Sequence, residues 1–267
     1  MKREIAIVGM IVCIAVGFVI GFFIPGLFTP APGKPLVEKI QDRGSIIVGT
    51  SADYPPFENV VGGEIVGFDI DVSELIADEL DVDLIMKDIP FDSLIGACKA
   101  GTIDMIAAAM TYDPESETGQ KRARQLAPSI TYIDVVKVVI VKEDSDLTID
   151  SLEDLEGVVV GCQGGTTMED ELEDAGISPV TYERVDTLML DLDGEGVDAV
   201  YVDGPIFETF KLLYDLKIIY SSDPDPLSLW CRKTTPDLLY VINEVLREAF
   251  IDGRMFAIWV TWFNATG

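Results

Sequence analysis

The sequence predicts an α/β protein with two lobes. From Ser45 onward, short runs of β-branched residues alternate with helical patterns, which is typical of βαβ units. The same alternation starts again at Val158, midway along the chain. With 267 residues the chain is long enough for two lobes of roughly 100 residues, each of which can bury a core.

The first half of the folded part predicts strands and helices in alternation. Residues 46–48 are Ile-Ile-Val and predict a strand, which a helical pattern over 69–80 follows. A second helical pattern covers 91–100, and the apolar run 103–109 predicts the next strand. We expect these segments to form one lobe.

The second half repeats this order. A valine run at 158–160 predicts a strand, the helical pattern 167–175 follows, and 197–202 predicts a further strand. Residues 236–257 predict one or two amphipathic helices with a break at Gly253. The chain then ends in an aromatic group that we expect to dock onto another surface, made of Trp259, Trp262 and Phe263.

The N-terminal residues 1–28 predict a membrane anchor. Lys2 and Arg3 precede an uncharged stretch that could form a helix of about 20 residues and cross the bilayer. The positive charges before this span place the rest of the chain outside the cytoplasm, at the cell membrane. Residues 29–35 are rich in proline and predict an extended linker.

A cleaved signal peptide is the alternative for this segment. Thr29-Pro30-Ala31 offers a small-x-small cleavage site, but its proline makes the site a poor one. We therefore favour an uncleaved anchor, with the folded part beginning near Leu36.

Charge and composition exclude several classes of function. The chain carries 47 acidic and 19 basic side chains, a net charge of −28, which opposes nucleic acid as a partner. It has no histidine, and Cys98, Cys162 and Cys231 show no metal-binding spacing, so we expect no metal or cofactor and treat these cysteines as structural. Common hydrolase motifs and phosphate loops are missing, so the sequence does not predict an enzyme.

A loop after the first predicted strand carries the clearest functional signal. Residues 49–58 contain two prolines, which end the strand and fix a rigid loop that bears Tyr54. Ligands favour this position, at the carboxyl end of a strand in an open α/β sheet. The segment Asp-Tyr-Pro-Pro-Phe-Glu at 53–58 resembles the polar amino-acid-binding group of ABC-importer solute-binding proteins, the bacterial-type solute-binding family 3.

Further segments resemble the same family in the same order, and together they cover roughly residues 36–267. They are 67–72, 91–95, 101–111, 151–167 and 197–203. The resemblance implies a two-lobed periplasmic-binding-protein-like fold of type II. It has two hinge crossings, near 132–135 and near 218–221. Lobe 1 would be discontinuous, over 36–133 and 222–267, and lobe 2 would cover 134–221.

The resemblance also implies how a zwitterionic ligand is held. Asp203 would accept from the α-ammonium, Thr111 and the amides near Thr166 and Thr167 would hold the carboxylate, and aromatic rings would cover the apolar part. Ser51 stands where relatives that bind cationic side chains often have aspartate, although Asp53 could face the same way, so the preference for a ligand side chain stays open. A moderately apolar pocket lined by Tyr54, Phe91 and Met168 would favour an uncharged ligand. The implied ligand-binding residues are Ser51, Tyr54, Phe91, Ala109, Met110, Thr111, Arg122, Gly165, Thr166, Thr167 and Asp203.

The chain departs from the family at the carboxylate-binding arginine. Ser116 stands where that arginine is expected, soon after Thr111. Arg122 and Arg124 lie downstream, which suggests an inserted loop with the arginine retained, and we favour Arg122. The alternative is that both arginines are solvated at the surface.

The resemblance implies a non-enzymatic function in transport. The protein would bind a small solute, an amino acid, between its lobes and deliver it to an ABC permease and its ATPase. One alternative is a cyclohexadienyl or arogenate-type dehydratase, because the same fold hosts such enzymes. Another is a ligand-sensing subunit that acts through a separate signalling partner.

Overall fold

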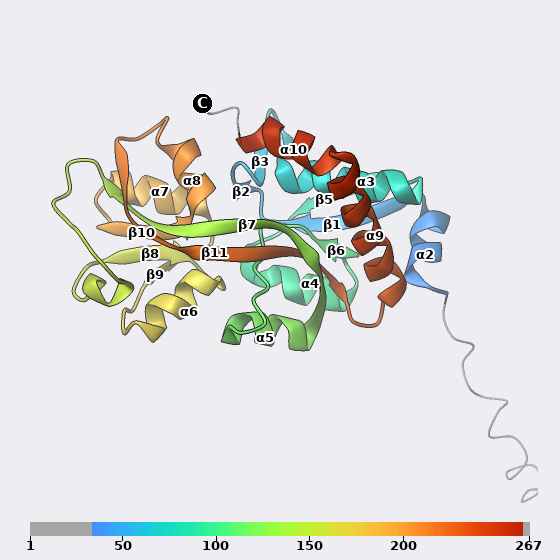
Figure 1. Ribbon diagram of the computed structural model, residues 1–267, viewed down its shortest axis with the longest axis horizontal. Coiled ribbons are helices and arrows are strands. Elements are labelled where there is room, and N and C mark those ends of the chain that lie inside the picture. Colours follow the sequence, from blue (N-terminus) through green and yellow to red (C-terminus); the bar gives the residue numbers. More distant parts are fainter. Residues whose placement is uncertain (1–33, 264–267) are drawn as a thin grey trace, which may run out of the picture. The chain divides into compact units, whose positions relative to one another are not determined.

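A computed structural model describes residues 34–263 (Figure 1). The predicted anchor or signal segment, and most of the linker at 29–35, lie outside the described residues. Within 34–263, no helix combines the length and apolar character needed to cross a membrane.

One eight-stranded sheet forms the centre of the fold, in the order β5-β1-β6-β11-β7-β10-β8-β9. Its two middle strands, β7 (Leu126–Lys142) and β11 (Leu216–Arg232), pair antiparallel along their length and run through both halves of the molecule in Figure 1. The predicted hinge crossings at 132–135 and 218–221 lie on these two strands. We call the half beyond β11 the first lobe and the half beyond β7 the second lobe.

The first lobe contains strands β1 (Ser45–Thr50), β5 (Asp83–Asp88) and β6 (Met105–Ile106). A small second sheet is formed by β2 (Asp53–Tyr54), β3 (Glu58–Val61) and β4 (Glu64–Val66). The helices are α2 (Leu36–Arg43), α3 (Phe68–Leu80), the 3₁₀ turn η1 (Phe91–Ser93), α4 (Leu94–Ala100), α5 (Glu117–Gln125), α9 (Pro236–Asp252) and α10 (Arg254–Phe263).

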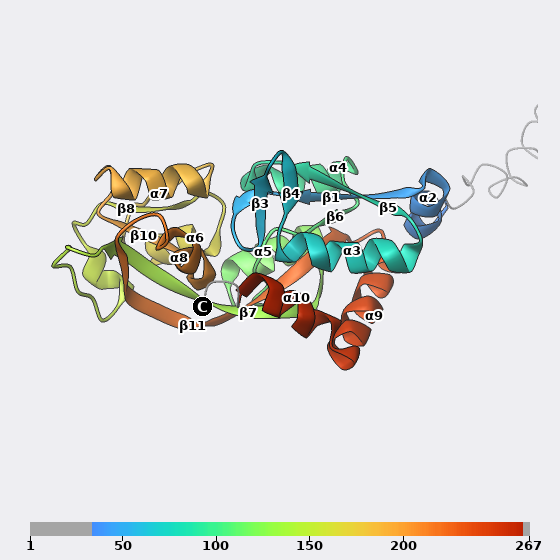
Figure 2. The same ribbon diagram turned by 90° about the horizontal axis from the view of Figure 1, so that it is seen from above.

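The second lobe contains strands β8 (Val160–Gln163), β9 (Val180–Tyr182) and β10 (Ala199–Asp203). Its helices are the 3₁₀ turn η2 (Leu152–Leu155), α6 (Thr167–Asp174), α7 (Val185–Asp193) and α8 (Gly204–Phe210). Figure 2 shows α6, α7 and α8 around this end of the sheet, with α3, α9 and α10 at the other.

The helical patterns are confirmed at 69–80, 91–100 and 167–175 within a few residues. Gly253 separates α9 from α10 with a φ of 89°, so the predicted break is also confirmed. The predicted strand 103–109 was too long, because ladder pairing covers only β6. The chain turns at Ala109, which has a φ of 44°.

Apolar side chains form buried clusters, the largest of which extends from the first lobe to Val185 and Leu188 of the second lobe. One cluster includes Ile46, Phe68 and Leu246, and a cluster in the second lobe includes Val160 and Leu172. Cys98, Cys162 and Cys231 are free thiols buried among such side chains.

Candidate functional site

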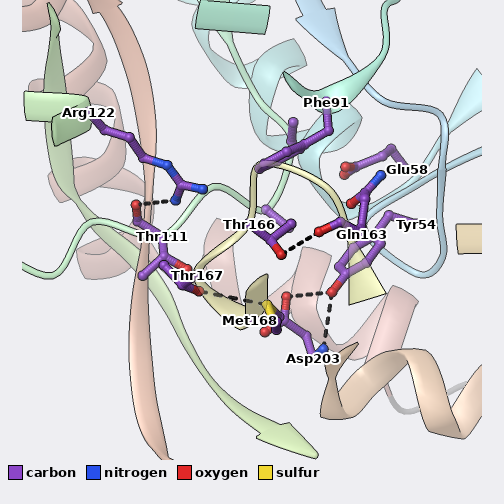
Figure 3. Close-up of a pocket in the computed structure, with 12 residues that line it drawn as sticks. Tyr54, Glu58, Phe91, Thr111, Arg122, Gln163, Thr166, Thr167, Met168 and Asp203 are labelled. Atoms are coloured by element: carbon purple, nitrogen blue, oxygen red, sulfur yellow. Dashed lines mark hydrogen bonds between the residues drawn. The ribbon is translucent and has the colours of Figure 1, made fainter. Parts of the chain in front are cut away.

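A cavity lies between the lobes (Figure 3). The first lobe supplies residues from β2, the start of β3, η1, the loop after β6 and α5. The second lobe supplies residues from the end of β8, the start of α6 and the end of β10. The lining consists of Tyr54, Glu58, Phe91, Ala108, Ala109, Thr111, Arg122, Gln163, Thr166, Thr167, Met168 and Asp203.

Most of the predicted ligand-binding residues lie in this lining. They are Tyr54, Phe91, Ala109, Thr111, Arg122, Thr166, Thr167 and Asp203. Segments far apart in sequence therefore meet at one cavity, and a ligand-binding role for these residues stays a prediction.

Three predicted residues lie outside the lining. The Ser51 hydroxyl turns to Asp53 and donates to its Oδ1 at 2.8 Å. Met110 is buried in the core of the first lobe, and its carbonyl accepts from the indole of Trp230 at 3.2 Å. Gly165 presents its carbonyl to the guanidinium of Arg122 at 3.0 Å.

Arg122 points into the cavity from α5, whereas Arg124 on the same helix is exposed. The Arg122 side chain donates to the carbonyls of Thr111 at 2.9 Å and Gly165 at 3.0 Å, and it lies 5.6 Å from the centre of the Phe91 ring. It is 3% exposed, and burial lowers its pKa to about 10, so it remains charged at neutral pH. The arginine at the cavity is therefore Arg122.

A buried carboxylate faces the same cavity from the opposite lobe. Asp203 ends β10, and its Oδ2 accepts from the Tyr54 hydroxyl at 2.8 Å. Its Oδ1 is buried without a hydrogen-bond partner among residues 34–263. Burial raises the pKa of Asp203 to about 7, although the Tyr54 hydrogen bond and the Lys137 charge lower it. An unpaired oxygen of this kind is costly unless a donor binds to it.

Within residues 34–263, the N-cap side chain makes no hydrogen bond to the first turn of α6, which lies at this cavity. Thr166 is the N-cap, but its hydroxyl donates to the Gln163 carbonyl at 2.7 Å instead of capping the helix. The amides of the first turn therefore remain available, and the helix dipole favours an anion there.

Glu58 is a cavity residue to which the sequence analysis gave no role. It is 1% exposed, and its Oε2 has no partner in the part of the chain that the structure describes. Burial, together with the charges of Asp69, Asp53 and Asp203, raises its pKa well above the usual value. Its place at the end of the Asp-Tyr-Pro-Pro-Phe-Glu segment was the only available signal.

Asp69 is a buried carboxylate that holds the turn after β6, where Ala109 lines the cavity. Its carboxylate accepts from the Ala109 amide at 2.8 Å and from the Tyr132 hydroxyl at 2.7 Å. These bonds hold the turn after β6 in place, and they explain the unusual backbone of Ala109.

Contacts outside the cavity also join the lobes. Asp53 Oδ2 accepts from the Val185 amide at 2.5 Å, and Arg184 donates to the Ala52 carbonyl at 3.2 Å. On the other side, Thr118 of α5 donates to Asp170 of α6. The lobes are thus closed around the cavity.

Comparison with known proteins identifies the family. The family model described as "Bacterial extracellular solute-binding proteins, family 3" matches residues 46–265. The chain belongs to this family. The relatives that the chain resembles are named as binding proteins.

Individual relatives support this assignment. The chain is 29% identical to the arginine-binding extracellular protein ArtP of Bacillus subtilis, over 83% of this chain and 87% of ArtP. The arginine-bound form of truncated ArgBP from T. maritima is 37% identical, with a TM-score of 0.74 over 79% of this chain and 99% of that one. The ancestral amino acid-binding protein AncCDT-1, a precursor of cyclohexadienyl dehydratase, is 29% identical, with a TM-score of 0.78 over 85% and 99%.

The position of Arg122 depends on close packing at Gly119. A Cβ atom at Gly119 would lie 1.9 Å from the Asp113 carbonyl oxygen, so Gly119→Ala must displace α5 or the loop before it. We expect about a tenfold loss of solute affinity and a destabilisation of about 2 kcal/mol. Calorimetry and thermal unfolding measure these two effects.

Gly96→Ala is the matched control. A Cβ atom there has nothing within 4 Å, and Gly96 lies in α4 away from the cavity. This variant should be as stable as wild type or slightly more stable, because alanine favours the helix. Equal affinity in both variants would contradict the packing argument.

Proposed function

We propose that this family 3 protein binds an α-amino acid between its lobes and delivers it to an ABC permease with its ATPase. The observation that supports this most is the pairing of Arg122 and Asp203, two buried charges of opposite sign on opposite lobes of one cavity. A zwitterion needs a cation for its carboxylate and an anion for its ammonium, since each charge loses hydration when it is buried.

The remaining lining residues fit the same pose. The ligand carboxylate would bind Arg122, the Thr111 hydroxyl and the amides of Thr166 and Thr167. The ammonium would donate to the unpaired Oδ1 of Asp203. Phe91 and Tyr54 would cover the apolar stem. The turn at Ala109, together with Ser51, Met110 and Gly165, would hold these groups in position.

We also propose that the ligand side chain is cationic, as in arginine or lysine. After Arg122 and Asp203 have taken the carboxylate and the ammonium, Glu58 is the ionisable acidic lining residue that remains. A guanidinium or ammonium group would supply a donor to its unpaired Oε2 and favour its ionised form. The arginine-binding relatives support this choice over the uncharged side chain that the apolar lining favours.

The cellular setting completes the proposal. The apolar N-terminal residues 1–28 would anchor the protein in the cell membrane, with 29–35 as a spacer and the binding domain outside. The lobes would divide into 36–133 with 222–267 and into 134–221, and they would open about β7 and β11.

A panel of ligands tests the proposal. We expect L-arginine or L-lysine to raise the melting temperature of the purified protein, because a ligand at 100 times its Kd stabilises the folded state by about 2.7 kcal/mol. Neutral and acidic amino acids should have smaller effects. If no amino acid shifts the transition, the assignment fails, and formation of product from prephenate or arogenate would then support the dehydratase alternative.

A further inference from the structure

A buried lysine lies behind the cavity. Lys137 is on hinge strand β7, directly opposite Asp203 in the ladder with β10, and is 2% exposed. Its ammonium pairs with Glu171 of α6 and lies 2.5 Å from Asp225 of β11. Glu171 also accepts from the Tyr201 hydroxyl at 2.8 Å. Lys137 thus joins both long strands to α6.

We propose that Lys137 is a positioning residue for ligand binding, which sets α6 and Asp203 at the spacing that an α-amino acid requires. This inference rests on the proposed function, and it concerns a residue that does not line the cavity.

The geometry of α6 explains how the tether acts. Thr167 and Glu171 are four residues apart, so they lie on the same face of the helix. Thr167 faces the cavity, while Glu171 is held by Lys137. Because α6 is only eight residues long, a contact at Glu171 fixes the position of its N-terminal amides relative to the strands.

The same lysine balances the charge around Asp203. The charged and titratable groups that act on Asp203 are Tyr54 of β2, Glu58 of β3, Arg122 of α5, Tyr132 and Lys137 of β7, Glu171 of α6 and Asp225 of β11. Lys137 lowers the pKa of Asp203, whereas Glu171 and Asp225 raise it. Without Lys137, two carboxylates would face Asp203 uncompensated, and its ionised form would be disfavoured.

The test compares Lys137→Met with wild type, using L-arginine as the probe and calorimetry from about pH 6 to about pH 8.5. We expect at least a tenfold loss of affinity at neutral pH. The pH at which affinity reaches half its maximum should also move upward, because ammonium binding requires the Asp203 carboxylate. Lys137→Arg should retain most of the affinity and the pH midpoint.

Lys142→Met is the matched control on the same strand. Lys142 pairs with the exposed Glu195. The Lys142→Met variant should therefore keep the affinity and the pH midpoint of wild type. If Lys137→Met lowers only the melting temperature, the lysine is merely structural and the inference is overturned. If wild type itself binds no amino acid, the proposed function has failed instead.

Glu171→Gln separates the effect of the tether on the position of α6 from its effect on the charge around Asp203. It also replaces Lys137→Met as the test variant if Lys137→Met does not fold. It weakens the tether but removes a negative charge near Asp203. We expect a lower maximal affinity with a midpoint that moves downward, opposite to Lys137→Met. Unchanged affinity in Glu171→Gln would overturn the role of the tether.

Discussion

Asp203→Asn should weaken binding of L-arginine by about 100-fold or more. The asparagine keeps the shape of Asp203, but it replaces the carboxylate that would accept from the ligand ammonium. Losing one partner of a buried charge pair costs about 2–5 kcal/mol, which corresponds to at least about 30-fold in Kd. Calorimetry at neutral pH measures this change.

The same substitution should stabilise the free protein. The pKa of Asp203 is raised to about 7 in the folded state, so the folded chain binds a proton more tightly than the unfolded chain. The contribution of Asp203 to stability therefore falls as pH rises from about 4 to about 7, and it levels off above that range. Asparagine carries no charge that must be buried. The melting temperature of the variant should therefore lie several degrees above that of wild type at pH 8, and the difference should be smaller at pH 5.

Asp144→Asn is the control, since Asp144 is an exposed turn residue far from the cavity lining. It should change neither affinity nor stability appreciably. If Asp203→Asn binds as well as wild type, Asp203 does not hold the ammonium and the proposed pose is wrong.

Arg122→Met should have an effect of similar size through the other end of the ligand. It removes the buried cation that would bind the carboxylate, and we expect about a 100-fold loss of affinity. Arg122→Lys keeps the charge but loses the planar fork that now reaches Thr111 and Gly165, so an intermediate loss of about tenfold is expected.

Arg124→Met distinguishes the two candidate arginines, because Arg124 lies on the same helix but is exposed. It should bind like wild type. A larger loss in Arg124→Met than in Arg122→Met would mean that α5 turns on binding and would contradict the assignment to Arg122.

Ordered segments made the fold and most of the cavity predictable from sequence. Motifs at strand ends, such as those that bear Tyr54 and Asp203, fall where a parallel sheet brings ligands. The choice of Arg122 over Arg124 also agrees with burial in the structure. These predictions depend on patterns among residues that are neighbours in the sequence, which can be recognised without the structure.

Features that depend on distant partners could not be predicted. Lys137 lies in a valine-rich strand, and only the approach of Glu171 and Asp225 makes its burial tolerable. Likewise, the direction of Ser51 follows from Asp53, which is itself held by Val185 in the other lobe. The early turn at Ala109 reflects its hydrogen bond to Asp69, forty residues away.

The contacts between the lobes outside the cavity bear on how cargo is unloaded. The bond from the Val185 amide to Asp53 and the bond from Thr118 to Asp170 do not involve any lining group that would touch the ligand. They therefore favour closure in empty and loaded protein alike, and the ligand must supply less free energy to hold the lobes shut. The same bonds must break before the solute is released. Tight binding at low solute concentration is therefore accompanied by slower release to the importer.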